Sequence, residues 1–301
     1  MKQQKRVALV LSSGGARGLA HIAVIEELQK RGYEIGSVAG ASMGALVGGM
    51  YAAGDLYKFK RWVTSLDMFD VFKLMDFSFS LTGFIRGDRV LNEIKKMIPD
   101  RNIETLGTPF TALAVDLKNK KEVVFDKGSL YKAIRASISI PMVFSPVITE
   151  ESILVDGGLM NPIPVDYVAK QEGDLLVVVN VNAATEYDSD NVIRQKREEE
   201  SNRFIALYRE KIDKLKQSFT EKFIHDDDEW GAADFFNQTI GTMLTRISSL
   251  LIEKSPPDIL IEISRKAGDT FDFYRAKEII AEGKKQAARV LDGFESKQLL
   301  G

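Results

Sequence analysis

A serine between glycines is the first candidate for chemistry in this sequence. Ser42 lies in Gly40-Ala41-Ser42-Met43-Gly44, a G-x-S-x-G motif. Such a motif places a nucleophilic serine at a sharp turn between a strand and a helix, where neighbouring side chains would collide. The positive end of the following helix would stabilise the serine alkoxide. The motif also arises by chance, so the strand–turn–helix setting carries the prediction.

The base that would activate Ser42 is not evident, because the chain contains only 2 histidines. His21 belongs to a predicted helix, where a single histidine is more typical of packing than of catalysis. His225 lies in the acidic run HDDDEW, which is typical of a solvated surface. Neither stands where a serine hydrolase would place its base.

Asp156 is the residue that we expect to act as the base. It begins Asp156-Gly157-Gly158 at the end of a predicted strand, although Asp-Gly alone indicates no more than a turn. Because ligand sites gather at the carboxyl ends of strands in such sheets, Asp156 and Ser42 should meet there. Burial would raise the carboxyl pKa from about 3.9 towards the working pH, which makes a Ser–Asp dyad workable.

A glycine-rich loop follows the first predicted strand, in the sequence SSGGARG at residues 12–18. It lacks the G-K-[ST] of a P-loop and the first glycine of a dinucleotide loop. It could form an oxyanion hole, since free amides at a helix start stabilise negative charge. Arg17 would steady the loop or attract an anionic head group, and a plain turn is the alternative. The candidate amides are those of Gly14, Gly15 and Ala16.

Strands and helices alternate along the chain in a way that would position these loops. Apolar runs at 6–11 and 35–40 predict strands, and the segments 16–32 and 42–54 predict helices. Short connections between them indicate a mainly parallel sheet covered on both faces. Later segments continue the pattern: strands at 110–117, 121–125, 174–182 and 258–264, a hairpin within 143–158, a helix at 131–140 ended by Pro141, and a closing helix at 273–291.

Composition excludes several classes of function. The net charge of −2 argues against a nucleic-acid binder, and the absence of cysteine excludes disulfides, thiolate catalysis and Cys-ligated zinc. The N-terminal apolar run is too short for a signal peptide, and no run is long enough to span a bilayer. We therefore expect a cytoplasmic protein that can still touch a membrane peripherally. The sequence does not indicate an oligomeric state.

Two segments differ from the rest of the chain. Residues 59–84 are rich in Phe, Met and Trp, which predicts an acyl-chain wall or a membrane-facing lid, with ordinary core packing as the alternative. Residues 190–223 are predicted to form a charged helix with an apolar stripe, inside a predicted insertion at about 185–235. That stripe is most simply explained by packing on the body, although a dimer or membrane contact would also use it.

The ordered motifs SSGGARGLAH, GASMG and DGG resemble those of bacterial patatin-like phospholipases. The likeness continues in LTGFIRGDRV, AIRASISIPMVFSPV and VDGGLMNPIPV, and it covers most of the chain outside about 185–235. It implies a three-layer α/β/α patatin-like fold in one hydrolase domain over residues 1–301. One departure is Ser13, where the family commonly has glycine, and a positive φ there would distort the loop.

The resemblance also implies the roles of the site residues. Ser42 would be the nucleophile, Asp156 the base, and the amides of Gly14, Gly15 and Ala16 the oxyanion hole, supported by Arg17. The remaining motif glycines are Gly18, Gly40, Gly44, Gly157 and Gly158.

The implied activity is that of a lipid acyl hydrolase of phospholipase or lysophospholipase type, which works through a serine acyl-enzyme without metal or cofactor. A general carboxylesterase or thioesterase with the same dyad is the first alternative. A non-catalytic lipid-binding or regulatory protein on the same fold is the second.

Overall fold

A central eight-stranded sheet organises the computed structural model, which describes residues 5–75, 83–85, 88–187 and 232–300. The strand order is β10-β9-β1-β2-β4-β8-β7, and β5 pairs with β4. The parallel strands are β1 (Arg6–Leu11), β2 (Glu34–Ala41), β4 (Phe110–Asp116), β9 (Leu175–Ala183) and β10 (Ile259–Ser264). The antiparallel strands are β5 (Lys121–Phe125), β7 (Val147–Ile148) and β8 (Ile153–Asp156). A separate parallel pair joins β3 (Gly83–Ile85) to β6 (Met142–Phe144).

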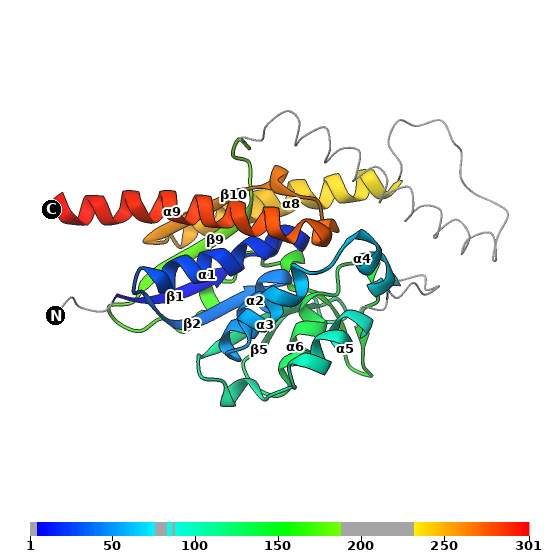
Figure 1. The fold of residues 1–301 in the computed structure, drawn as a ribbon. Coiled ribbons are helices and arrows are strands. Elements are labelled where there is room, and N and C mark those ends of the chain that lie inside the picture. The colour runs from blue at the N-terminus through cyan, green and yellow to red at the C-terminus, as the bar shows by residue number, and fades with distance from the viewer. Residues whose placement is uncertain (1–4, 76–82, 86–87, 188–231, 301) are drawn as a thin grey trace.

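Helices cover both faces of this sheet, because successive side chains of a buried strand point to opposite sides. Leu9 and Leu11 of β1 belong to the large core that includes α1, α2 and α9, whereas Val10 packs in a second cluster that contacts α8. Figure 1 shows the layers, with α1 and α9 running along the sheet. The helices are α1 (Ala20–Lys30), α2 (Met43–Ala52), α3 (Leu56–Val63), α4 (Met68–Leu74), α5 (Asp88–Met97), α6 (Leu130–Ser137), α8 (Ala232–Lys254) and α9 (Ala276–Leu300).

The predicted three-layer α/β/α fold with a mainly parallel sheet is confirmed. The predicted helix at 131–140 is too long, since α6 ends at Ser137. The residue before a proline is driven towards extended backbone, and the carbonyl oxygen of Ser139 accepts a hydrogen bond from Asp156 instead of continuing the helix. The predicted charged helix at 190–223 lies outside the described residues. None of the described helices is both long and apolar enough to cross a membrane.

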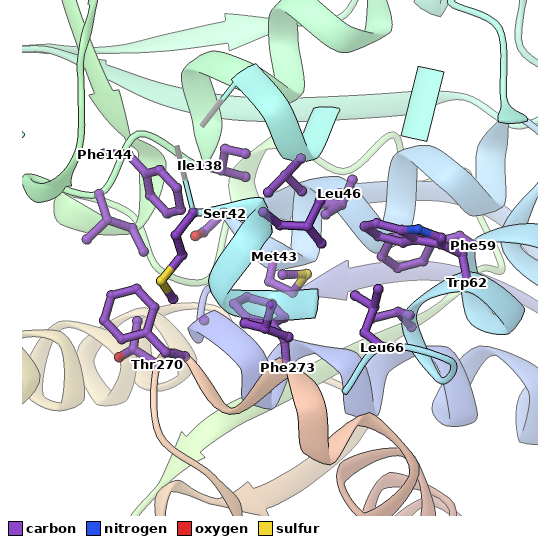
Figure 2. Close-up of a pocket in the computed structure, with 18 residues that line it drawn as sticks. Ser42, Met43, Leu46, Phe59, Trp62, Leu66, Ile138, Phe144, Thr270 and Phe273 are labelled. Carbon is purple, nitrogen blue, oxygen red and sulfur yellow. The ribbon is translucent and has the colours of Figure 1, made fainter. Parts of the chain in front are cut away.

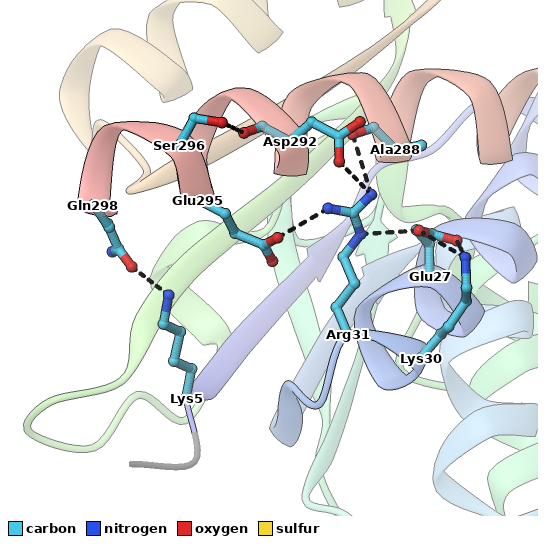
Figure 3. A network of polar contacts seen from close by, with 9 residues as sticks. All are labelled: Lys5, Glu27, Lys30, Arg31, Ala288, Asp292, Glu295, Ser296 and Gln298. Carbon is cyan, nitrogen blue, oxygen red and sulfur yellow. Dashed lines mark hydrogen bonds and ion pairs between the residues drawn. The ribbon is translucent and has the colours of Figure 1, made fainter. Parts of the chain in front are cut away.

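A polar network joins α9 to the C-terminal end of α1 (Figure 3). Arg31 follows α1 and binds Glu27 on that helix at 2.9 Å. It also binds Asp292 at 2.7 Å and Glu295 at 3.0 Å, both on α9. The Arg31 side chain is 16% exposed, but those of Asp292 and Glu295 are 68% and 34% exposed, so solvent weakens these two ion pairs. The network holds α9, and the segment just before α9 lies beside the glycine-rich loop.

Candidate active site

Ser42 occupies the single residue between β2 and α2, with φ 55° and ψ −123°. A non-glycine residue in this region is strained and persists only when its surroundings enforce the conformation. The neighbouring glycines let the backbone close tightly around Ser42, because a Cβ on Gly44 would lie 2.2 Å from the carbonyl oxygen of Leu11. A Cβ on Gly40 would lie 2.4 Å from the backbone of Gly44. The predicted strand–turn–helix setting is thus present, and its glycines are sterically required.

Asp156 reaches the level of Ser42 through strand register. Ala41, just before the serine, pairs with Leu113 of β4, and Asp156 pairs with the next residue, Ala114. The strands β2 and β8 therefore flank β4 at the same height. The sequence-based reason was partly wrong, since β8 is antiparallel to β4 and strand direction alone would not bring its carboxyl end to the level where β2 ends. The register brings the two residues together instead.

Burial determines the pKa of the Asp156 carboxyl group, since this residue is only 5% exposed. Desolvation raises its pKa to about 7, against the lowering effects of the Ser42 hydroxyl and the Gly158 amide. The Gly158 amide donates to Oδ1 at 2.7 Å. Among the described residues, Oδ2 has no partner within strict hydrogen-bond geometry, so the contact with Ser42 is loose. Catalytic hydrogen bonds are often long before substrate binds. A carboxyl group with this pKa can accept a proton near neutral pH.

The glycine-rich loop lies beside the serine, and its amides differ in availability. The Ala16 amide donates to the carbonyl oxygen of Thr270 at 3.0 Å, so this amide is already occupied. Gly15 has φ 55° and lines the same cavity as Ser42. Among the described residues, Ser13 is not one of those with positive φ, and the loop therefore accommodates serine there without strain. The amides of Gly14 and Gly15 are the better candidates for an oxyanion hole.

Arg17 is half-buried, and its guanidinium is directed into the protein. Its guanidinium donates to the carbonyl oxygens of Val181 at 3.2 Å and Gly268 at 2.8 Å, and to Oδ1 of Asn182 at 2.8 Å. Burial lowers its pKa, although Asp269 partly compensates. These contacts tie the loop to β9 and to the segment after β10. The geometry fits the steadying role.

His21 is fully buried, and its Nε2 lies 2.9 Å from the carbonyl oxygen of Ser12. A carbonyl only accepts, so Nε2 carries the proton in this contact. Burial lowers the pKa of His21 to about 4, which keeps the ring neutral at pH 7. The ring therefore holds the start of the glycine-rich loop, as expected for a packing residue. His225 lies outside the described residues.

An apolar cavity of about 90 Å³ opens beside Ser42. Figure 2 shows Ser42 between Phe144 on one side and Leu46 on the other, with Phe59 and Trp62 beyond Leu46. The segment predicted as an acyl-chain wall supplies seven lining residues: Phe59, Trp62, Val63, Leu66, Val71, Leu74 and Met75. Residues 76–82 of that segment lie outside the described residues.

The sequence did not identify one wall of this cavity, which comes from the region before α9. Thr270, Phe271 and Phe273 line it, far along the chain from Ser42. Of these three residues only Phe273 belonged to a predicted element, the closing helix at 273–291. Asp116 at the end of β4 is a turn residue, since its carboxylate accepts the amides of Lys118 and Ile153.

Comparison with known proteins places this geometry in a family. The model of the patatin-like phospholipase family matches residues 9–169, which include the glycine-rich loop, the serine elbow and the aspartate turn. The chain belongs to the patatin-like phospholipase family. The family match ends before Thr270 and Phe273, so the C-terminal wall of the cavity lies outside the matched part.

Several known proteins are similar to this chain over most or part of its length. An uncharacterized NTE family protein of Mycobacterium tuberculosis is 33% identical over 96% of this chain and 92% of its own length. Patatin-like phospholipase domain-containing protein 7 of Rattus norvegicus is 28% identical over 62% of this chain, but the match covers only 14% of that protein. The structure of VipD from Legionella pneumophila aligns with 97% of this chain and 67% of its own, at a TM-score of 0.47 and 15% identity.

Proposed function

We propose that the protein hydrolyses carboxylic esters of lipids through an acyl-enzyme on Ser42, with Asp156 as the base. The observation that carries this proposal is the buried carboxyl group of Asp156, whose pKa is about 7, at the height of a strained serine. Family membership supports the same reaction class. Strained backbone and a strongly shifted carboxyl pKa both cluster at functional sites.

In the first half of the reaction, Ser42 Oγ attacks the ester carbonyl carbon while its proton passes to the ionised Asp156. The amides of Gly14 and Gly15 donate to the developing oxyanion, and the N-terminus of α2 adds its positive dipole. The intermediate collapses, the bond to the leaving alcohol breaks, and Asp156 returns the proton to that oxygen. Water then repeats the sequence on the acyl-enzyme and releases the carboxylic acid.

The lining of the cavity favours an acyl chain as the group that enters beside Ser42. Aliphatic and aromatic side chains such as Leu46 and Phe273 form its walls, so a charged head group would remain outside. The volume of about 90 Å³ is below the roughly 300–1,000 Å³ of typical ligand pockets. Flexible side chains such as Met43 and Met75 must therefore rotate to admit a long chain. A lysophospholipid, with one acyl chain, is the preferred substrate class.

Exposed aromatic residues near the cavity support contact with a lipid surface. Tyr57 on α3 is 69% exposed and Phe69 on α4 is 62% exposed, and both helices contribute cavity walls. Aromatic side chains partition well at the boundary between water and lipid. We therefore propose that these two helices face the lipid when substrate enters.

The test is initial-rate hydrolysis of a lysophospholipid and of a p-nitrophenyl ester series, with and without vesicles. Wild type should cut both, whereas folded Ser42→Ala and Asp156→Asn should each lose about 10³-fold or more in kcat. A strict preference for short esters or thioesters, unaffected by vesicles, would favour the general esterase instead. If the wild type binds lipid but cuts no ester, the protein is a lipid-binding member of the fold.

A further inference from the structure

A single short segment at the C-terminal end of α6 contacts both members of the proposed dyad. The hydroxyl oxygen of Ser137 accepts a hydrogen bond from the backbone amide of Ser42 at 2.9 Å. Two residues later, the carbonyl oxygen of Ser139 accepts the backbone amide of Asp156, also at 2.9 Å. The nucleophile and the base are thus fixed to one three-residue piece of chain. This piece lies in AIRASISIPMVFSPV, a motif to which the proposed mechanism assigns no role.

The contact with Ser42 acts on the most strained point of the site. The amide of Ser42 lies at the turn where φ is 55°, and it is buried together with Ser137, which is fully inaccessible to solvent. A buried amide without an acceptor would lose a hydrogen bond, so the turn would relax towards a geometry that finds one. Because the Ser137 hydroxyl accepts this amide, the turn gains no hydrogen bond by relaxing. It thereby helps to hold the serine side chain in its present direction.

The segment is itself held in place by Arg135. Nη1 of this arginine donates to the Ser139 hydroxyl at 2.7 Å, and Nη2 donates to the carbonyl oxygen of Ser145 at 3.1 Å. The Ser139 hydroxyl in turn donates to the carbonyl oxygen of Arg135 at 2.8 Å. An ion pair with Asp88 at 2.8 Å orients the guanidinium. A rigid segment with these anchors can transmit position to both catalytic candidates.

We propose that Ser137 is a positioning residue that sets the nucleophile elbow, and that the Ser137–Ser139 segment fixes the spacing between Ser42 and Asp156. The inference rests on the proposed function. It assigns Ser137 no contact with substrate and no proton transfer. Its effect is on the orientation of Ser42, so it should change the rate of bond formation at the serine more than the affinity for substrate.

The test compares Ser137→Ala with wild type in two assays. The first is the rate of covalent modification by a fluorophosphonate, in which Ser42 Oγ bonds to phosphorus, fluoride leaves and the serine proton passes to Asp156. The second is ester hydrolysis, resolved into kcat and KM. Loss of the acceptor should slow modification and lower kcat by roughly 10- to 100-fold, with KM changed less than about threefold. The pH at half-maximal kcat/KM should not move, because the Ser139 carbonyl still holds Asp156.

Ser37→Ala is the matched control for loss of a buried serine hydroxyl. Ser37 is on β2, the strand that carries Ser42, and its hydroxyl donates to the carbonyl oxygen of Ala169 at 2.6 Å. This variant should melt at a temperature similar to that of Ser137→Ala but retain modification and turnover within about twofold of wild type. Ser137→Cys, which keeps the size and a weak acceptor, should fall between Ser137→Ala and wild type. If Ser137→Ala does not fold, the cysteine variant decides the question.

Modification of Ser137→Ala or Ser137→Cys at the wild-type rate would overturn the inference, and so would an equal loss in Ser37→Ala. In either case normal modification of wild-type Ser42, located by peptide mass, would leave the proposed function standing. Absence of any modification of wild-type Ser42 would overturn the proposed function and this inference together.

Discussion

Replacing the proposed base should stabilise the protein while it abolishes activity. Burial raises the pKa of Asp156 from 3.8 to about 7, so the folded chain keeps a proton that the unfolded chain releases over this interval. Stability from this group is therefore full below about pH 4, falls as the pH rises, and is lost above about pH 7. In Asp156→Asn the side chain at this position carries no charge at any pH, and its Oδ1 can still accept a hydrogen bond from the Gly158 amide.

The magnitude follows from the interval between the two pKa values. At about 1.4 kcal/mol per pH unit, the distance from 3.8 to about 7 corresponds to roughly 4 kcal/mol. Asp156→Asn should thus exceed wild type in free energy of unfolding by up to roughly 4 kcal/mol at pH 8. At pH 5 the gain should be only roughly 1–2 kcal/mol, because pH 5 lies only about one unit above the ordinary pKa of 3.8.

Denaturant unfolding of both proteins at pH 5 and pH 8 measures these differences. Asp116→Asn is the control of opposite sign, because a side-chain hydrogen bond from Asn119 and backbone amides lower the pKa of Asp116. That contribution is present above the ordinary pKa of 3.8 and is lost at lower pH, so Asp116→Asn should destabilise the protein equally at pH 5 and pH 8. If Asp156→Asn is less stable than wild type at pH 8, or if its advantage does not grow from pH 5 to pH 8, the carboxyl group is not a buried acid with a raised pKa.

Three further predictions concern the site. In wild type, kcat/KM should rise about tenfold per pH unit up to the pKa of about 7 and then level off, and a rise centred near pH 4 instead would contradict burial of Asp156. His21→Ala should lower the free energy of unfolding by about 1–3 kcal/mol, because the Ser12 carbonyl loses its donor, yet the folded variant should keep the wild-type pH profile; complete inactivity of the folded variant would indicate a catalytic histidine. Trp62→Ala should enlarge the cavity and shift the p-nitrophenyl ester preference towards longer chains, and an unchanged chain-length profile would show that the acyl group binds elsewhere.

Local sequence patterns were enough to predict most strands of the sheet, four of the helices and the proposed dyad, but not α3, α4, α5 or α8. G-x-S-x-G between an apolar run and a helix describes the Ser42 elbow, because the steric demands of that turn act on adjacent residues. The buried strands are apolar runs, and their alternation with helices fixes the layered architecture. The aspartate was located by its turn, although the strand that carries it runs in the opposite direction to the one expected.

Features that depend on distant residues could not be predicted from the sequence. Thr270 occupies the Ala16 amide from the far end of the chain, and no local pattern marks such a contact. The hydrogen bond from Ser42 to Ser137 joins residues 95 positions apart in the sequence, and it likewise has no local signal. Packing of non-adjacent elements decides both contacts, so only three-dimensional structure reveals them.

The most direct test of the central claim is to trap the acyl-enzyme. The protein is mixed with a p-nitrophenyl ester, quenched in acid within the first turnovers and digested, and the acylated peptide is identified by mass spectrometry. Our account predicts one acyl group on the Ser42 side chain in wild type, and none in Ser42→Ala, which should also lack turnover. Acylation of another residue, or undiminished hydrolysis by Ser42→Ala, would contradict it.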